Sequence, residues 1–225
     1  MAVGIATSRV ESILKQIATL SDEKRLILRG ITWREYQELL DELGEHRWVL
    51  VSFSEGVLEI MPLSRRHERL KGFIARLIWA IAEERKMDLE PAGSTTLQLE
   101  SIKKGAEPDT SFFIQHAAQM MKDTHDLLED PPPDLVVEVD IFHPSYSKQE
   151  LYASFGVPEI WQYDGREFRI LQLVGHTYAE AERSLAFPFL HTTEIAAFVE
   201  RSKAESQVPL IKSFQEWLRA NKPTE

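Results

Sequence analysis

Apolar residues recur every three or four positions in several stretches of the chain, the spacing that puts them on one face of a helix. Helices are therefore predicted in residues 8–20, 30–44, 64–84, 116–122, 145–155, 192–202 and 210–220. The second helix begins at Thr32, whose spacing to Glu35 is that of a capping box, and it ends at Gly44. The third begins at Ser64 and keeps its apolar period up to Glu84, so we expect it to lie across a sheet.

Short apolar runs between these helices predict strands. They lie in residues 47–53, 57–61, 88–100, 108–114, 134–140 and 158–174. The first two runs favour a hairpin, and residues 88–100 and 158–174 each favour two strands joined by a glycine-containing turn. One βαβ-like unit follows from residue 134. The pattern predicts an α/β or α+β fold with a central mixed sheet flanked by helices.

The composition is that of an ordinary globular protein, and no break in it suggests two separate cores within the 225 residues. The chain has no cysteine, which excludes disulfides and thiolate metal sites and fits a reducing compartment. The first residues lack the pattern of a secretion signal, and no window approaches the roughly 18 apolar residues of a membrane span. We therefore expect a cytoplasmic protein with no membrane partner.

The formal net charge of −10 argues against a protein that simply coats DNA, because neutralising phosphates supplies most non-specific affinity. It does not exclude a nuclease, in which acidic side chains gather around a metal ion. A local basic strip, formed by Arg65, Arg66, Arg69 and Lys71, can coexist with an acidic body.

Acidic residues stand in two of the predicted strands, where a half-buried strand does not need them. Asp109 opens one strand, while Glu138 and Asp140 are two residues apart near the end of another and so share a face. Their repulsion is costly unless a positive group compensates it, and Mg²⁺ or Mn²⁺ prefers such oxygen ligands. Spacing alone leaves open the alternative that Glu138 and Asp140 lie at a frayed strand end, hydrated or paired with arginine.

Lys148 falls in the first turn of the helix that follows this strand. A chain that doubles back there could bring its ammonium group beside Glu138. In phosphodiester hydrolysis such a lysine orients or activates the attacking water and offsets the charge that develops on the phosphate. The alternative is a solvated surface lysine.

Two levels of similarity connect these residues with a known family. The pair Pro108-Asp109, followed by Glu138, resembles the core of PD-(D/E)XK nucleases, with Asp140 where the usual lysine would stand. More specifically, residues 29–200 resemble the Uma-two family of proposed restriction endonucleases. The segments that carry this resemblance occur in the following order: "GITWREYQELL", "GVLEIMPLS", "HERLKGFIARLI", "GSTTLQLESIKKGAEPD", "PPPDLVVEVDIFHPS", "KQELYASFGVPEIWQYDG" and "SLAFPFL".

The resemblance implies a restriction-endonuclease-like core with Asp109 and Glu138 as metal ligands and the backbone carbonyl of Val139 as a third. Lys148 matches the helix lysine of the family, which takes the place of the missing strand lysine. Glu68, in the first turn of the long helix, would add a direct or water-mediated contact to the metal. Its neighbour His67 either reaches the site or is a packed, hydrogen-bonded histidine. Asp140 would either add a ligand or cancel the charge of Lys148.

The resemblance also implies an activity and a division of the chain. We expect a nuclease-like domain in residues 29–200, preceded by a peripheral helix and lead-in in 1–28 and followed by a helix in 201–225 that packs on the same domain. The expected activity is Mg²⁺- or Mn²⁺-dependent hydrolysis of DNA. A homodimer would place two sites on the two strands of a duplex. The alternative is a catalytically inactive, nuclease-like binding or assembly module.

Overall fold

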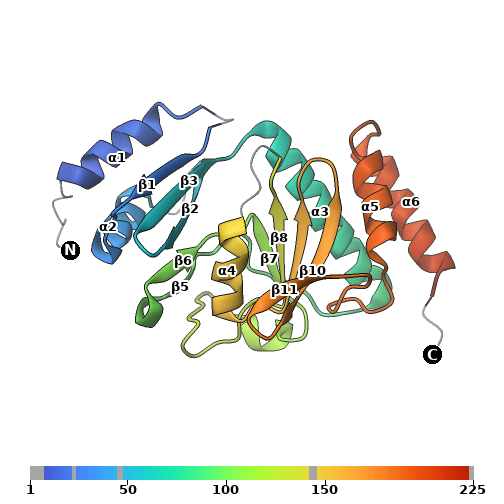
Figure 1. Ribbon diagram of the computed structural model, residues 1–225. Helices are drawn as coiled ribbons and strands as arrows, with labels where there is room; N and C mark the ends of the chain where they lie inside the picture. Colours follow the sequence, from blue (N-terminus) through green and yellow to red (C-terminus); the bar gives the residue numbers. More distant parts are fainter. Residues whose placement is uncertain (1–7, 22–23, 45–47, 142–145, 223–225) are drawn as a thin grey trace.

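The computed structural model describes residues 8–21, 24–44, 48–141 and 146–222, whose strands form two sheets (Figure 1). The first sheet is antiparallel and has the order β1-β3-β2-β6-β5. Its strands are β1 (Leu26–Arg29), β2 (Val49–Ser54), β3 (Val57–Pro62), β5 (Leu97–Leu99) and β6 (Lys104–Ala106).

The second sheet is mixed and has the order β11-β10-β9-β8-β7-β4. Its strands are β4 (Glu90–Pro91), β7 (Thr110–Phe113), β8 (Leu135–Val139), β9 (Glu159–Tyr163), β10 (Phe168–Val174) and β11 (Thr177–Ala181). β8 and β9 are parallel, and the other neighbours are antiparallel. The parallel pair needs a crossover, which helix α4 supplies.

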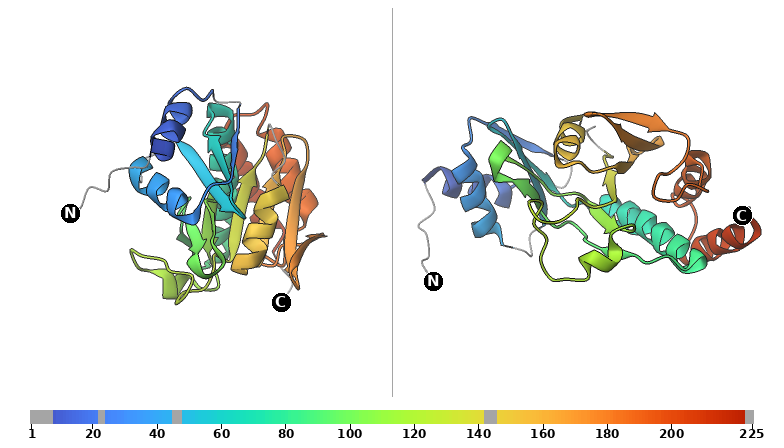
Figure 2. Two further views of the ribbon diagram at one scale, coloured as in Figure 1. Left: turned by 60° about the vertical axis from the view of Figure 1, so that its left-hand side comes forward. Right: turned by 90° about the horizontal axis from the view of Figure 1, so that it is seen from below.

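Helices cover the sheets on several sides (Figure 2). They are α1 (Ser8–Ala18), α2 (Trp33–Leu43), α3 (Arg65–Arg85), α4 (Tyr146–Phe155), α5 (Thr192–Arg201) and α6 (Gln207–Ala220), with short 3₁₀ turns η1 (Glu100–Ile102) and η2 (Ala117–Met120). α1 and α2 pack on the first sheet, whereas α3, α5 and α6 share a core with one face of the mixed sheet. Within the described ranges, no helix has both the length and the apolar character needed to cross a membrane.

The α+β class and the central mixed sheet agree with the prediction from sequence, as do the capped helices. Thr32 and Glu35 form the reciprocal hydrogen bonds of a capping box, and Ser64 caps α3. The predicted caps of α4, Ser145 and Ser147, have side chains outside the described residues.

Some details of the prediction were wrong. The two strands predicted in residues 88–100 exist as β4 and β5, but they belong to different sheets. Residues 116–122 contain a single 3₁₀ turn rather than a helix. Three strands, β1, β6 and β11, were missed. β1 and β11 lie at sheet edges and contain no fully buried side chain, and β6 has only three residues.

β8 is buried along its whole length, and its two faces serve different cores. Leu135, Val137 and Val139 pack in the core that contains α3. Val136 packs in a second core that contains α4 and residues of β5 and β6. Because side chains alternate along a strand, Glu138 is directed to the α4 side as well. A carboxylate is thereby carried into a buried region between the mixed sheet and α4.

Gly105 allows a test of how closely α2 packs against β6 of the first sheet. It lies in β6, and a methyl group on its Cα would overlap the ring of buried Tyr36 in α2. We expect Gly105→Ala to lower the free energy of unfolding by about 1–3 kcal/mol, the usual effect of overpacking. Urea unfolding followed by circular dichroism measures the change.

The matched control is Gly72→Ala in α3, where a methyl group meets no atom within 4 Å. That variant should gain up to about 1 kcal/mol from the better helix propensity of alanine. Equal stability of the two variants would contradict the packing of Tyr36 against β6.

Candidate active site

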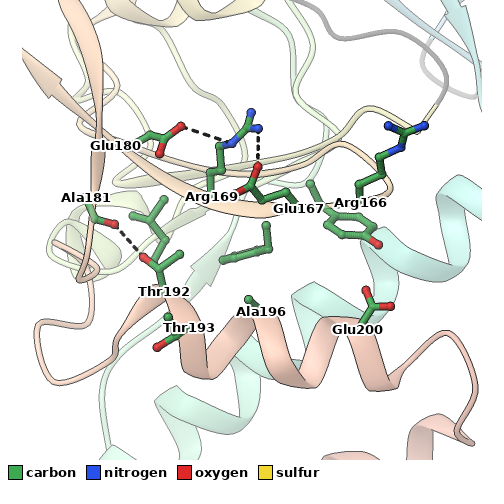
Figure 3. A pocket seen from close by; sticks show the side chains of 12 residues that line it. Arg166, Glu167, Arg169, Glu180, Ala181, Thr192, Thr193, Ala196 and Glu200 are labelled. Atoms are coloured by element: carbon green, nitrogen blue, oxygen red, sulfur yellow. Dashed lines mark hydrogen bonds and ion pairs between the residues drawn. The ribbon is translucent and has the colours of Figure 1, made fainter.

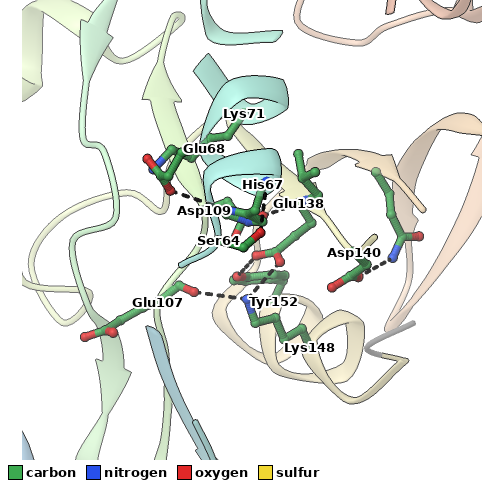
Figure 4. A network of polar contacts seen from close by, with 12 residues as sticks. Ser64, His67, Glu68, Lys71, Glu107, Asp109, Glu138, Asp140, Lys148 and Tyr152 are labelled. Carbon is green, nitrogen blue, oxygen red and sulfur yellow. Dashed lines mark hydrogen bonds and ion pairs between the residues drawn. The ribbon is translucent and has the colours of Figure 1, made fainter. Parts of the chain in front are cut away.

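Three elements bring their functional side chains together near the carboxyl end of β8 (Figure 4). Asp109 directly precedes β7, Glu138 lies in β8 and Lys148 lies in the first turn of α4. All three side chains are buried, with 1–4% of their surface exposed. The alternative of a hydrated, frayed strand end for Glu138 is therefore wrong.

Glu138 accepts hydrogen bonds from two side chains of α4. Lys148 Nζ lies 2.8 Å from its Oε2, and the Tyr152 hydroxyl donates to its Oε1. Lys148 and Tyr152 are four residues apart and so stand on one face of the helix. Lys148 also donates to the backbone carbonyl of Glu107, at 3.2 Å. The helix thus presents two donors to the two oxygens of one carboxylate.

The charges of this pair follow from its burial. Burial raises the pKa of Glu138 to about 8; Lys148 opposes this shift, while Asp109 and Asp140 add to it. Burial alone would lower the pKa of Lys148, but the surrounding carboxylates, Glu138 first, raise it. The two shifts conflict if Glu138 is taken as neutral, since a neutral partner would not hold the lysine proton. Both hydrogen bonds of Glu138 are donated to it, by the Lys148 ammonium and by the Tyr152 hydroxyl, so we assign a charged Lys148 and an ionised carboxylate.

Asp109 is held through one oxygen. Its Oδ2 accepts a hydrogen bond of 2.6 Å from the backbone N–H of Val139 and lies 2.8 Å from His67 Nε2. The imidazole is within ion-pair distance, but its N–H is not aligned for a hydrogen bond. Burial would raise the pKa of Asp109, whereas His67 and Lys148 lower it below its usual value. The other oxygen, Oδ1, is buried and has no hydrogen-bond partner among the described residues.

His67 belongs to this cluster rather than to the packed core alone. The Ser64 hydroxyl oxygen accepts a hydrogen bond of 3.2 Å from the backbone N–H of His67, which fixes the first turn of α3 beside Asp109. Burial would lower the pKa of His67, but the carboxylates of Asp109 and then Glu68 raise it. The histidine is therefore a positive neighbour of Asp109 in acidic solution.

The remaining predicted site residues lie around these contacts. Asp140 is buried and accepts a hydrogen bond of 3.3 Å from Gln162 Nε2. The side chain of Glu68 is 42% exposed and pairs with Lys71 at 2.7 Å. Glu68 and Asp109 both contact His67, which lies between them. Val139 contributes its backbone N–H to Asp109. Their roles as metal ligands stay predictions.

As the side chains lie, no group of three or more histidine or carboxylate residues in the described part of the chain is arranged to hold a metal ion. The chemistry of the donors nevertheless fits a hard cation. Asp109 Oδ1 is a buried anionic oxygen without a hydrogen bond, an arrangement that costs free energy unless a positive group meets it. Asp109 and Glu138 are close enough for each charge to influence the other.

Sequence reasoning missed two partners of the site. Tyr152 was not among the predicted site residues, yet its hydroxyl reaches Glu138. Its spacing of four from Lys148 was a usable signal, because both residues had to share a helix face. The carbonyl of Glu107 carries no sequence signal, since every residue has one.

Two of the four residues of the predicted basic strip have internal partners. Arg69 donates to the backbone carbonyl of Ser202, and Lys71 pairs with Glu68. Arg65 and Arg66 are exposed on the first turn of α3 and form no ion pair with another described residue. Arg65 and Arg66 thus place two exposed positive charges next to His67 in the chain.

A cavity of about 430 Å³ lies away from this cluster, between β10, β11 and α5 (Figure 3). None of Asp109, Glu138 or Lys148 lines it. Its charged side chains largely neutralise one another, since Arg169 pairs with Glu167 at 2.6 Å and with Glu180 at 3.3 Å. The candidate chemistry therefore belongs to the buried cluster rather than to this cavity.

The α+β fold, with its mixed sheet flanked by helices, is consistent with a restriction-endonuclease-like core. Residues 33–202 match the model of the Uma2 family, described as "Putative restriction endonuclease". The chain belongs to this family, as its motifs indicated. A search of curated proteins found no match.

The pair of Asp109 and His67 predicts how stability depends on pH. The raised pKa of His67 stabilises the fold below its unfolded value of 6.5, and this contribution is lost as pH rises through the folded pKa. The lowered pKa of Asp109 stabilises the fold above 3.8 and is lost as pH falls further. The free energy of unfolding of wild type should therefore exceed that of His67→Gln by the largest amount at about pH 5.5 and by the smallest above about pH 9.

Urea unfolding at both pH values measures this difference. His176→Gln, on the exposed turn after β10, serves as the control and should differ little from wild type at either pH. A His67→Gln effect that grows toward alkaline pH would contradict the assigned charges.

The buried ion pair predicts strong coupling between its two members. Glu138→Gln and Lys148→Met each leave one charge buried without its partner, so each should lower the free energy of unfolding by about 3–5 kcal/mol. The double variant should lose clearly less than the sum of the two, because no unpaired charge remains. Urea unfolding of the four proteins forms the cycle; additive losses would contradict the pairing.

Proposed function

We propose that this protein is a metal-dependent endonuclease that hydrolyses phosphodiester bonds in DNA. The observation that carries the proposal is the bare, buried Oδ1 of Asp109 beside the pair of Glu138 and Lys148. Membership of the Uma2 family supports the nuclease class. Reaction in the cytoplasm and assembly into a homodimer remain predictions from sequence.

Asp109 and Glu138 would hold Mg²⁺ or Mn²⁺ through their carboxylate oxygens, with the carbonyl of Val139 and the carboxylate of Glu68 as further proposed ligands. Such an ion, when bound, lowers the pKa of a water molecule and offsets charge on the phosphate. The Val139 N–H fixes Oδ2 of Asp109, which leaves Oδ1 for the ion. Each carboxylate is thus oriented by the protein before any ion arrives.

Lys148 would position the attacking water. Its contacts with Glu138 and with the Glu107 carbonyl use two of its three N–H bonds within the described residues. The third can donate to a water molecule or to a phosphate oxygen. Because the surrounding carboxylates keep the lysine protonated, it acts as a donor and a positive charge rather than as the base.

The acidic surface restricts where DNA could approach. Arg65 and Arg66 are exposed at the N-terminus of α3, where the helix dipole adds positive potential. His67 of the same turn contacts Asp109. A phosphate backbone bound by the two arginines would therefore lie beside the proposed metal ligands.

A second candidate function is an inactive, nuclease-like binding module. Both oxygens of Glu138 already accept hydrogen bonds, and buried Asp140 adds further negative charge beside them. If no ion displaces or joins these donors, the cluster would only stabilise the fold. The absence of Mn²⁺ binding would favour this candidate.

Plasmid nicking in the presence of Mg²⁺ or Mn²⁺ tests the proposal. Asp109→Asn and Glu138→Gln keep the side-chain shapes but remove the anionic oxygens, so each should lower the nicking rate by about 100-fold or more. Lys148→Met should cause a comparable loss through the missing donor. Rates are read from the conversion of supercoiled to open-circular DNA, at a temperature where every variant is folded.

Asp134→Asn is the matched control. Asp134 is also a buried carboxylate that accepts backbone hydrogen bonds, from Ile114 and His116, but it lies outside the cluster. This variant should lose stability and keep its nicking rate. Nicking that persists in Asp109→Asn and Glu138→Gln would refute the proposal.

A further inference from the structure

Tyr152 is fully buried in α4, and its hydroxyl donates to Oε1 of Glu138. We propose that Tyr152 is a positioning residue that fixes the Glu138 carboxylate for the cation and thereby sets the affinity of the site. This inference rests on the proposed function, because it requires that Glu138 bind a metal ion.

The geometry of the contacts constrains Glu138 at both oxygens. Lys148 holds Oε2 and Tyr152 holds Oε1, and both donors come from the same face of one helix. Rotation of the carboxylate plane would break both hydrogen bonds together. Each carboxylate oxygen has two lone pairs, so an oxygen that accepts one hydrogen bond can still bind a cation. The two donors therefore orient Glu138 without using up its capacity as a ligand.

The hydroxyl of Tyr152 is separable from the packing of its ring. The ring lies in the core shared by Val136, Leu151 and Phe155, where a phenylalanine would fill the same space. The hydroxyl is the donor in this contact, since an ionised carboxylate oxygen can only accept. What the tyrosine adds over phenylalanine is thus one permanent donor aimed at Glu138.

Hydrogen bonds to ligating carboxylates characteristically tune metal affinity, and their loss lowers it about 10–100-fold. Without the Tyr152 donor, Glu138 would be held at one oxygen only. The carboxylate would then have to be ordered when the cation binds, which weakens binding. We expect a loss of about 10-fold in Mn²⁺ affinity for Tyr152→Phe.

The experiment measures Mn²⁺ binding by electron paramagnetic resonance of the free ion, for wild type, Tyr152→Phe and Tyr178→Phe. Tyr178 is the matched control, because its hydroxyl donates to the Val157 carbonyl at 2.6 Å and does not contact Glu138. Both variants lose one tyrosine hydrogen bond, so both should melt at a lower temperature than wild type. Only Tyr152→Phe should bind Mn²⁺ more weakly. All titrations are run below the lowest melting temperature.

The outcomes separate this inference from the proposed function. Equal Mn²⁺ affinity of wild type and Tyr152→Phe would overturn the positioning role and leave the metal site intact. Tighter binding by Tyr152→Phe would also overturn it, since the hydroxyl would then compete with the cation. Wild type that binds no Mn²⁺ at millimolar concentration would overturn the proposed metal site and the inference with it. Asp109→Asn, which lacks the anionic Oδ1, gives the Mn²⁺ affinity expected when the proposed site is disabled.

Discussion

Burying a carboxylate and an ammonium group costs each ion several kcal/mol of hydration, and their attraction repays that cost only when further hydrogen bonds satisfy both. Glu138 and Lys148 meet this condition with help from two other groups. The Tyr152 hydroxyl donates to the second oxygen of the carboxylate, and the Glu107 carbonyl accepts a hydrogen bond from a second N–H of the ammonium. The ion pair is thus the centre of a small network rather than an isolated contact.

The network in turn depends on where α4 docks. The helix covers the face of β8 that carries Val136 and Glu138, and it also packs against residues of β5 and β6 from the first sheet. Glu107, which follows β6, accepts hydrogen bonds from the Val51 backbone and the Thr96 hydroxyl through its side chain. The same residue therefore joins the first sheet to Lys148. Packing between the two sheets and α4 positions the charged groups.

Much of the fold could be predicted because local signals agreed with the final packing. Thr32, Glu35 and Ser64 are capping residues whose effect extends over only a few positions, and α2 and α3 begin where they indicate. β1 and β11 lack such signals, since they are only four and five residues long without a fully buried side chain, and their pairing partners are set by the tertiary fold. The division into two sheets is a long-range property of the same kind.

The site shows the same division between local and long-range information. Asp109 and Glu138 stood out because carboxylates are unusual in apolar strands, and Lys148 because of its place after the strand. The contact between His67 and Asp109 joins residues 42 positions apart (109 − 67 = 42), and only the docking of α3 on the mixed sheet brings them together. Polar partners supplied by the backbone, such as the Glu107 carbonyl, are invisible in any sequence.

The placement of Lys148 and Tyr152 on one helix face has a consequence for recognising distant relatives. A search for a lysine two residues after the strand glutamate fails on this chain, since Asp140 stands there. In this chain the lysine stands ten residues after the glutamate, and the tyrosine stands four residues beyond the lysine. The two helix positions are tied by helical geometry, whereas the ten-residue spacing from Glu138 to Lys148 is not. A profile that scores the Lys148–Tyr152 spacing separately from the loop would tolerate insertions there and still retrieve this arrangement.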